Sequence, residues 1–454
     1  MLDTVRIGGG VGFYGDTFLP ALEMVQQSAV DFICFEDLAE LTLAILQKDR
    51  SRNPKQGGYT KDLIPMLEAG LGTALHNHIR IITNAGGLNP QAAAQAVMEL
   101  AKRLGLSLKV ATVTGDAILE RLPDFLPFSH METGEPLPQD IGQRALFANV
   151  YLGARPIVRA LEEGADLVIT GRVADPSLFL APVVYHFGWE WNNWDRIALG
   201  TVVGHLLECS SQVTGGNHGG HWDTIEGLDH IGFPIAEVSG DGEVVITKLP
   251  GSGGRVDVDT VREQLLYEIH DPKAYLTPDV VVNVTGARLE SVGWDRVKIS
   301  GIRGTKRPNQ YKALLGYEDG YMGQGMMGYS WPDALKKAEA AEAIMRRQIA
   351  RFNLPVDEIR AEYLGYNSLH GPLADTKAAE SLNEVYLRIA VRTQDKRTAE
   401  QISRLMVPLA LGGPPTASGL IGVDRVRGLM GLWPSLVDRD LVDAGVSVTV
   451  EEVR

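Results

Sequence analysis

The feature that most constrains the fold is a glycine turn after a short apolar run near the start of the chain. Residues 5–7 lead into Gly8-Gly9-Gly10-Val11-Gly12-Phe13-Tyr14-Gly15-Asp16, and a helical pattern follows. An apolar run that ends in glycines before a helix is typical of the first strand and turn of an α/β domain. From this turn we expect ligand contacts by Gly10, Gly12, Phe13, Gly15 and Asp16.

Acidic residues decide how far the turn resembles a dinucleotide-binding site. Its glycines fit G-x-G-x-x-G, and Glu36-Asp37 ends the next apolar run about 20 residues later, as dinucleotide binding requires. Asp16, however, lies where the first helical turn would offer N–H groups and a positive dipole to a pyrophosphate. A carboxylate there would repel a diphosphate. An NAD-dependent oxidoreductase therefore stays an alternative, and the cofactor is left open.

Apolar runs alternate with amphipathic segments over the first 170 residues. The runs cover 4–8, 31–36, 79–84, 108–114 and 166–170, and the amphipathic segments cover 38–47, 61–69, 90–104 and 145–163. Continuous apolar strands separated by helices predict a mostly parallel sheet flanked by helices. The fold class is therefore α/β.

The ends of these predicted strands carry polar residues and glycines. Glu36-Asp37 follows the second run, and Thr114-Gly115-Asp116 follows the fourth. Ligands of open α/β sheets bind outside the carboxyl ends of the strands, so these ends predict a site. Tight turns and helix caps are the favoured explanation for any single end, whereas five such ends at one edge favour a ligand site. From the third and fifth ends we expect site residues at Asn84, Gly86, Gly87, Arg172 and Asp175.

Two later loops are rich in glycine. Residues 208–223 combine glycines with amide and imidazole side chains, which is incompatible with an ordinary helix or strand. Residues 248–255 form a second glycine loop with flanking cations, which is able to present N–H groups to an anion. It lacks the G-K-[ST] ending of a nucleotide-hydrolysing P-loop. Expected substrate contacts are Gln212, Gly215, Gly216, Asn217, Gly251, Gly253 and Gly254.

The C-terminal part follows a different pattern. Strands are expected over 280–284, 297–299, 359–364, 384–393 and 446–452, with helices over 331–351 and 398–411. This proportion predicts a smaller C-terminal α+β domain of ferredoxin-like type. We expect an α/β domain over residues 1–245, a connecting region with the second glycine loop over 246–330, and the smaller α+β domain over 331–454.

Composition excludes several classes of protein. A formal net charge of −14 argues against binding nucleic acid through its phosphates. Only two cysteines occur, Cys34 and Cys209, so no disulfide framework or thiolate zinc site is expected. Neither a secretory leader nor an apolar run of membrane-spanning length is seen, which predicts a cytoplasmic protein without membrane contacts. Soluble enzymes of this size usually form symmetric oligomers, so we expect a homo-oligomer.

Several ordered motifs together resemble the acyclic terpene utilisation AtuA-like family. They are the glycine turn to Asp16, Phe35-Glu36-Asp37-Leu38-Ala39-Glu40, Thr83-Asn84-Ala85-Gly86-Gly87, Gly171-Arg172-Val173-Ala174-Asp175, Gln212-Val213-Thr214-Gly215-Gly216-Asn217, Pro250-Gly251-Ser252-Gly253-Gly254 and Tyr267-Glu268-Ile269-His270-Asp271-Pro272. The resemblance runs from about residue 5 to about residue 330 and more weakly beyond. It implies catabolism of terpene-like compounds, and a lyase or hydratase acting on a branched hydroxyacyl-CoA or related carboxylic acid.

The strand-end residues fit such chemistry. Adding or removing water beside a carbonyl needs a base or acid and donors aimed at the enolate oxygen. Glu36 and Asp175 are candidate bases, and Arg172 is a candidate for binding a carboxylate or phosphate. A structural Arg172–Asp175 ion pair is an equal alternative. A further alternative is a non-catalytic acyl-CoA-binding subunit that serves a partner enzyme, with coenzyme A entering only as part of the ligand.

Histidines offer a rival reading as metal ligands. His218, His221 and Asp223 lie in one loop and would hold a divalent ion if they converge. The pair His76 and His78 precedes a predicted strand, at the edge opposite the expected site. Ligand-contacting or solvated loop histidines are the simpler interpretation.

Overall fold

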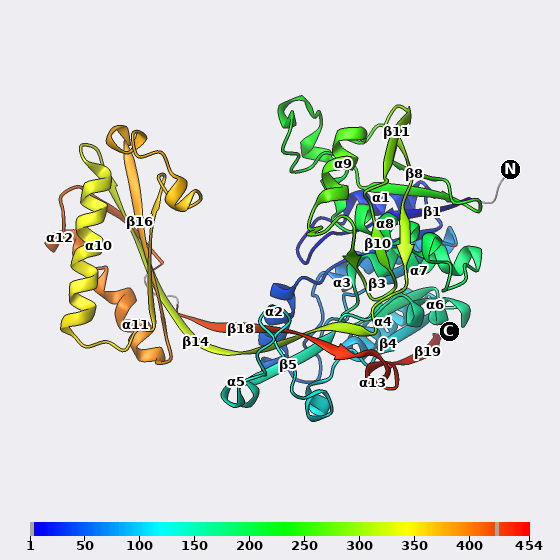
Figure 1. The fold of residues 1–454 in the computed structure, drawn as a ribbon, viewed down its shortest axis with the longest axis horizontal. Helices are drawn as coiled ribbons and strands as arrows, with labels where there is room; N and C mark the ends of the chain where they lie inside the picture. Colours follow the sequence, from blue (N-terminus) through cyan, green and yellow to red (C-terminus); the bar gives the residue numbers. More distant parts are fainter. Residues whose placement is uncertain (1–3, 423–425) are drawn as a thin grey trace. The chain divides into compact units, whose positions relative to one another are not determined.

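The computed structural model describes residues 4–422 and 426–454, which form two compact units (Figure 1). The larger unit contains the described residues up to Gln139, then Ala145–Leu315 and Trp433–Arg454. The smaller unit contains Asp140–Arg144 and the described part of Gly316–Leu432. The smaller unit is therefore inserted in the sequence of the larger one.

The centre of the larger unit is a parallel sheet made from the apolar runs predicted by the sequence. Five strands lie side by side and parallel in the order β1, β2, β3, β6, β4. Their bounds are β1 Thr4–Gly9, β2 Phe32–Phe35, β3 Arg80–Thr83, β4 Leu108–Thr114 and β6 Leu167–Thr170. The predicted α/β class is confirmed.

Antiparallel strands extend this sheet to ten strands on both sides. Beside β1 lie β7 (Pro234–Ser239), β8 (Val244–Lys248), β12 (Arg296–Ser300) and β11 (Arg288–Gly293). Beside β4 lies β19 (Ser447–Val453), which pairs with β4 from Ser447 opposite Thr114 to Val453 opposite Leu108. The closing strand expected over 446–452 is thus an edge strand of the main sheet.

Helices cover both faces of the sheet. Met24 of α1 (Leu19–Gln26), Leu71 of α3 (Leu63–His76) and Val97 of α4 (Pro90–Leu104) belong to one core cluster with Ile33 of β2. The next residue of β2, Cys34, faces the other way, and its thiol donates to the Leu178 carbonyl of α7 (Asp175–Phe187). The remaining helices of this unit are α2 Glu40–Arg52, α6 Arg155–Glu162, α8 Trp194–Leu207, α9 Val258–Leu266 and α13 Arg439–Asp443.

One amphipathic segment differs from the helix that its pattern predicts. Residues 145–163 form strand β5 (Ala145–Val150) and then helix α6. Backbone bonds fix the strand, since the Ile118 N–H donates to the Ala148 carbonyl and the Val150 N–H donates to the Asp116 carbonyl. Pro156 then lies in the first turn of α6, a position where proline favours the start of a helix.

Smaller elements complete the larger unit. A separate three-stranded antiparallel sheet has the order β13 (Arg303–Thr305), β10 (Val281–Asn283) and β9 (Tyr275–Leu276). Short 3₁₀ helices cover Leu119–Phe125, Ser210–Gln212, Trp222–Thr224 and Leu228–His230.

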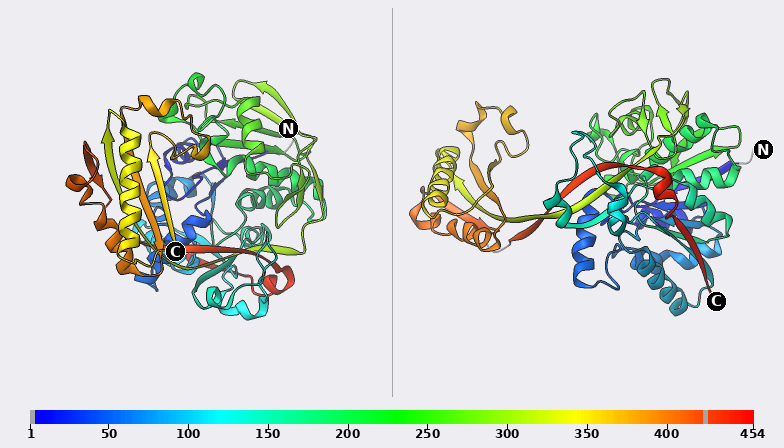
Figure 2. Two further views of the ribbon diagram at one scale, coloured as in Figure 1. Left: turned by 60° about the vertical axis from the view of Figure 1, so that its left-hand side comes forward. Right: turned by 60° about the horizontal axis from the view of Figure 1, so that its bottom comes forward.

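The smaller unit is an α+β domain, as the sequence predicts. Its sheet order is β15 (Glu358–Leu364), β16 (Glu384–Thr393), β14 (Gln310–Ser330) and β17 (Ala417–Ile421), with antiparallel pairs throughout (Figure 2). Along the chain, α10 (Ala334–Arg351) follows β14, and α11 (Lys396–Leu405) and α12 (Leu409–Gly412) follow β16. This is the β-α-β-β-α-β order of ferredoxin-like domains. The chain enters the unit within β14 and leaves it within β18 (Arg427–Asp438); α5 spans Gln139–Gln143.

In the part of the chain that the structure describes, every helix is too short or too polar to cross a membrane.

Candidate functional site

A cavity of about 550 Å³ lies at the carboxyl ends of β1, β2 and β6. All of its lining residues belong to the larger unit. The expected residues that line it are Gly12, Phe13, Asp16, Glu36, Arg172, Asp175, Gln212, Gly216 and Asn217. We call it the site cavity.

Arg172 organises the charges of the site cavity. Its side chain is 2% exposed, and its guanidinium stacks on the Tyr151 ring with 4.1 Å between Cζ and the ring centroid. Nη2 lies 2.9 Å from Oδ1 of Asp175, and Nη1 lies 3.6 Å from Oε1 of Glu36. Nη1 also donates to the Leu38 carbonyl. The guanidinium therefore contacts both of the predicted catalytic carboxyl groups. Its described contacts are with protein groups, namely these carboxyls, the Leu38 carbonyl and the Tyr151 ring.

Glu36 is buried at the end of β2 and is held by two donors. Its Oε1 accepts from the Leu38 N–H at 2.8 Å and from Nδ2 of Asn84 at 2.8 Å. Burial, reinforced by the nearby Asp175 charge, raises the pKa of Glu36 well above its usual value, against the opposing effect of Arg172. Asn84, predicted to bind substrate, is fully buried and instead positions Glu36. Burial thus favours the protonated form of Glu36.

Asp175 differs from Glu36 in exposure. It is the first residue of α7, and a third of its side chain is exposed to the cavity. Burial raises the pKa of Asp175 above its usual value, against the opposing effect of the Arg172 charge. The helix N-terminus and the arginine both favour its ionised form. The two carboxyl groups beside Arg172 therefore have different environments, which is how acid and base roles are divided within one site.

A second ion pair borders the cavity next to Tyr151. Oε1 of Glu40 accepts from the Tyr151 hydroxyl at 2.7 Å and from Nζ of Lys312 at 3.0 Å. Although burial acts to raise the pKa of Glu40, Lys312, the Tyr151 bond and Arg172 together lower it to about 2. Glu40 is hence ionised, and it fixes the ring on which Arg172 stacks.

Sequence reasoning did not single out Glu208, which also lines the cavity. Oε1 of this 6%-exposed residue lies 3.0 Å from Nδ1 of buried His205, and among the described residues its Oε2 has no hydrogen-bond partner. Burial raises the pKa of Glu208 and lowers that of His205 to about 4. Burial thus favours the protonated carboxyl of Glu208 and the neutral imidazole of His205. Its sequence signal was a charged residue directly after the apolar helix α8.

The glycine turn is closed by its own aspartate. The Asp16 carboxylate accepts from the Gly12 N–H at 3.0 Å, the Thr17 N–H at 2.7 Å and the Ser210 hydroxyl at 2.9 Å. The Gly10 N–H donates to the Cys34 carbonyl at 2.7 Å. The motif's N–H groups at Gly10 and Gly12 are therefore already used where a pyrophosphate would need them.

The turn's glycines are required by close packing. A Cβ at Gly10 would clash with the Phe35 ring, and one at Gly12 would lie 2.9 Å from the Cys209 carbonyl carbon. Gly15, in contrast, has open space around it and a φ of +96°, which favours glycine. The G-x-G-x-x-G spacing here serves backbone packing and a turn.

Other predicted contacts lie outside the site cavity. Gly87 lines a different cavity at the same sheet edge, and its N–H donates to the Asn84 carbonyl. The Gly215 N–H donates to the Gln212 carbonyl at 3.1 Å. Those expected residues that do not line the site cavity are Gly10, Gly15, Asn84, Gly86, Gly87, Gly215, Gly251, Gly253 and Gly254.

The loop histidines are not brought together as a metal site. His218 forms an ion pair with Glu263 of α9 through Nδ1. Within residues 4–422 and 426–454, the structure contains no group of three or more histidine, cysteine, aspartate or glutamate side chains arranged to hold a metal ion. Burial raises the pKa of Cys209, which lines the cavity, so this thiol stays protonated.

The arginine-centred group of carboxyls lies at the carboxyl edge of a parallel sheet in an α/β protein, which is the edge where open α/β sheets bind ligands. The model of the acyclic terpene utilisation family protein AtuA matches residues 5–448, and the chain belongs to this family. Membership implies a catabolic role in acyclic terpene utilisation. No curated protein and no solved structure matches the chain.

Proposed function

We propose that the chain is a lyase or hydratase that adds water to, or removes it from, a branched hydroxyacyl thioester or related carboxylic acid. The observation that carries this proposal is the placement of Glu36 and Asp175 on one guanidinium within one cavity. The family's catabolic role supports this class of substrate. Coenzyme A would enter as part of the substrate.

The chemistry follows from the different environments of the two carboxyls. In dehydration, ionised Asp175 removes the proton next to the carbonyl, and protonated Glu36 donates its proton to the departing hydroxyl. The C–H and C–O bonds break, a C=C bond forms, and water leaves. Oε1 of Glu36 accepts two hydrogen bonds, which leaves Oε2 to carry the transferred proton. Hydration is the same sequence reversed.

Arg172 has a positioning role in this scheme. Because its guanidinium contacts Glu36, Asp175 and the Leu38 carbonyl, it holds the acid and the base at a fixed separation. Its positive charge also stabilises Asp175 in the ionised form. Gln212 and Asn217 on the cavity wall are the amide side chains available to bind the substrate carbonyl.

Activity of single variants tests the proposal. The assay follows deuterium uptake from solvent next to the carbonyl, together with interconversion of hydroxyacyl and enoyl forms, by mass spectrometry. Glu36→Gln and Asp175→Asn should each lower kcat about 10²- to 10⁴-fold, as expected for loss of a general acid or base. Glu99→Gln, on the exposed surface of α4, is the matched control. Full activity in both site variants would rule out this assignment.

A further inference from the structure

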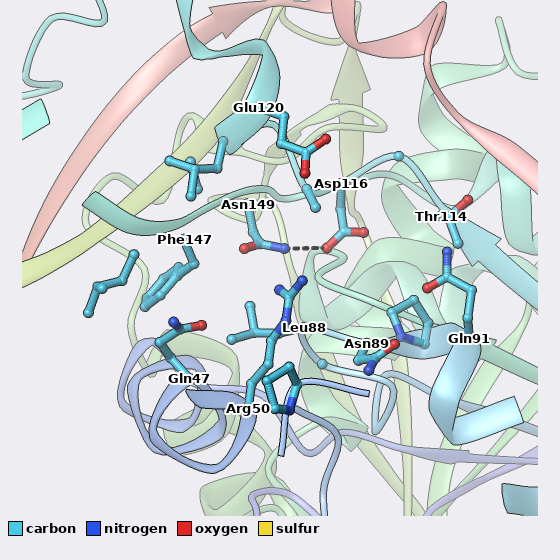
Figure 3. A pocket seen from close by; sticks show the side chains of 18 of the residues that line it. Gln47, Arg50, Leu88, Asn89, Gln91, Thr114, Asp116, Glu120, Phe147 and Asn149 are labelled. Atoms are coloured by element: carbon cyan, nitrogen blue, oxygen red, sulfur yellow. Dashed lines mark hydrogen bonds between the residues drawn. The ribbon is translucent and has the colours of Figure 1, made fainter. Parts of the chain in front are cut away.

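A second cavity, of about 630 Å³, lies at the carboxyl ends of β3 and β4. It is lined by α2, by the turns after β3 and β4, and by β5 (Figure 3). Its polar lining includes Gln47, Arg50, Asp116 and Asn149. Asp116 and Asn149 are buried and joined by a 2.7 Å hydrogen bond from Nδ2 of Asn149.

The Arg50 guanidinium is directed into this cavity, toward the Asp116–Asn149 pair (Figure 3). In the described part of the chain it has neither a hydrogen-bond acceptor nor an ion-pair partner. Its stem passes close to the Gly58 backbone, where an added Cβ would lie 3.3 Å from Cδ of Arg50. The Gly58 carbonyl accepts from the Leu88 N–H at 2.8 Å. A guanidinium without an ion-pair partner is suited to a carboxylate ligand.

A second group in the cavity also has no partner. Oε1 of Gln47, one turn before Arg50 on α2, is buried and receives no hydrogen bond within the described structure. A buried carbonyl oxygen without a donor is costly, so a ligand that supplies an O–H would be favoured once a rotation of the Gln47 amide turns this oxygen toward the cavity. The Asp116 carboxylate, in contrast, already has hydrogen-bond donors, since it accepts from Nδ2 of Asn149 and from the Arg172 N–H.

We propose that this cavity binds a small hydroxycarboxylate, with its carboxylate on Arg50 and its hydroxyl donating to Oε1 of Gln47. The cavity is separate from the site cavity, and none of the residues given catalytic roles in the proposed function lines it. The proposal therefore does not depend on the lyase assignment.

Calorimetric titration with malate and succinate tests the proposal, because the two dicarboxylates differ by one hydroxyl. Malate should bind about tenfold more tightly than succinate. Arg50→Gln should weaken both ligands about tenfold or more, as expected for loss of a charge-assisted bond. Gln47→Leu should abolish the preference for malate. Arg52→Gln, which alters an exposed arginine of α2 outside the cavity, should bind malate as the wild type does.

Two results would overturn the inference. One is the absence of malate binding at millimolar concentrations by a protein whose circular dichroism is native. The other is unchanged malate affinity in Arg50→Gln. Asp175→Asn separates the two cavities: it should leave malate affinity unchanged, and a parallel loss in this variant would place malate in the site cavity. A failed lyase assay with intact malate binding would affect the proposed function alone.

Discussion

The two cavities at this sheet edge each contain an arginine, and the arginines have opposite surroundings. Arg172 is 2% exposed and is surrounded by Glu36, Asp175 and the Tyr151 ring. Arg50 lies on an exposed helix and has no partner within the described residues. A buried arginine at a strand end thus organises the carboxyl groups of the protein, whereas an arginine without an ion-pair partner is available to a ligand.

Both cavities share one wall, formed where β6 ends. The backbone N–H of Arg172 donates to Oδ2 of Asp116 at 2.8 Å in the second cavity, while its guanidinium faces the site cavity. Gly171 lies against the same carboxylate. Substitutions along this wall should separate what the two arginines contribute.

Removal of the buried arginine should have the largest effect. Arg172→Met leaves Glu36 and Asp175 without their shared cation, so we expect the free energy of unfolding to fall by about 3–5 kcal/mol. Urea denaturation measures this loss. Arg172→Lys should recover part of the stability, because it restores the charge without the planar contacts. A loss below about 1 kcal/mol would contradict the organising role given to Arg172.

The wall itself is tested by Gly171→Ala. The added Cβ would lie 2.5 Å from both carboxylate oxygens of Asp116, so the neighbouring backbone must shift. We expect a destabilisation of about 1–3 kcal/mol in thermal or urea unfolding. Gly72→Ala, in the interior of α3 with only ordinary contacts nearby, is the control. It should cost nothing or stabilise the helix slightly.

A pH titration of stability tests the burial of carboxyls beside the site cavity. Burial raises the pKa of Asp37 from 3.8 to about 7 despite the hydrogen bond from the Thr83 hydroxyl. Between these values the folded protein keeps a proton that the unfolded chain has lost, so stability falls as pH rises. Asp37→Asn should reduce the slope by about 1 kcal/mol per pH unit. An unchanged slope between about pH 4 and 7 would show that Asp37 is ionised in the folded protein.

The unpaired arginine should have the smallest effect on stability. Arg50→Gln removes no described contact of the side-chain nitrogens, so the free energy of unfolding should change by less than about 0.5 kcal/mol. Urea denaturation in the absence of ligand measures this. A loss comparable with that of Arg172→Met would mean that Arg50 supports the fold, and the contrast between the two arginines would fail.

Much of the fold was predictable because apolar patterns are local. The five central strands are continuous apolar runs, and α10, β15 and β16 of the ferredoxin-like unit lie at the positions that their local patterns predict. Strand β5 was missed because its apolar residues run into the amphipathic pattern of α6. Its pairing is set by distant backbone groups near Asp116 and in β14, which a local pattern does not record.

The individual residues of the candidate site could be predicted from the sequence, but their division between two cavities could not. Glu36, Arg172 and Asp175 follow strands and were found from that position. The split into two cavities depends on β6 lying between β3 and β4, out of sequence order. That order places Arg172 beside Glu36 and leaves Gly87 in the other cavity. Glu208 was missed because a charged residue directly after an apolar helix is a weak signal, and the contact of its carboxyl with buried His205 is not visible in the sequence.

The pairing of β19 with β4 has a consequence for synthesis of the chain. Without residues 447–453, the strand formed by residues 108–114 would be the edge of the sheet. While the residues between β4 and β19 are synthesised, the N–H and C=O groups along that side of β4 lack their final partner. An exposed strand edge of this kind is prone to aggregation. The inserted unit will by then have emerged. This edge of the main sheet is therefore completed only after β19 has been synthesised.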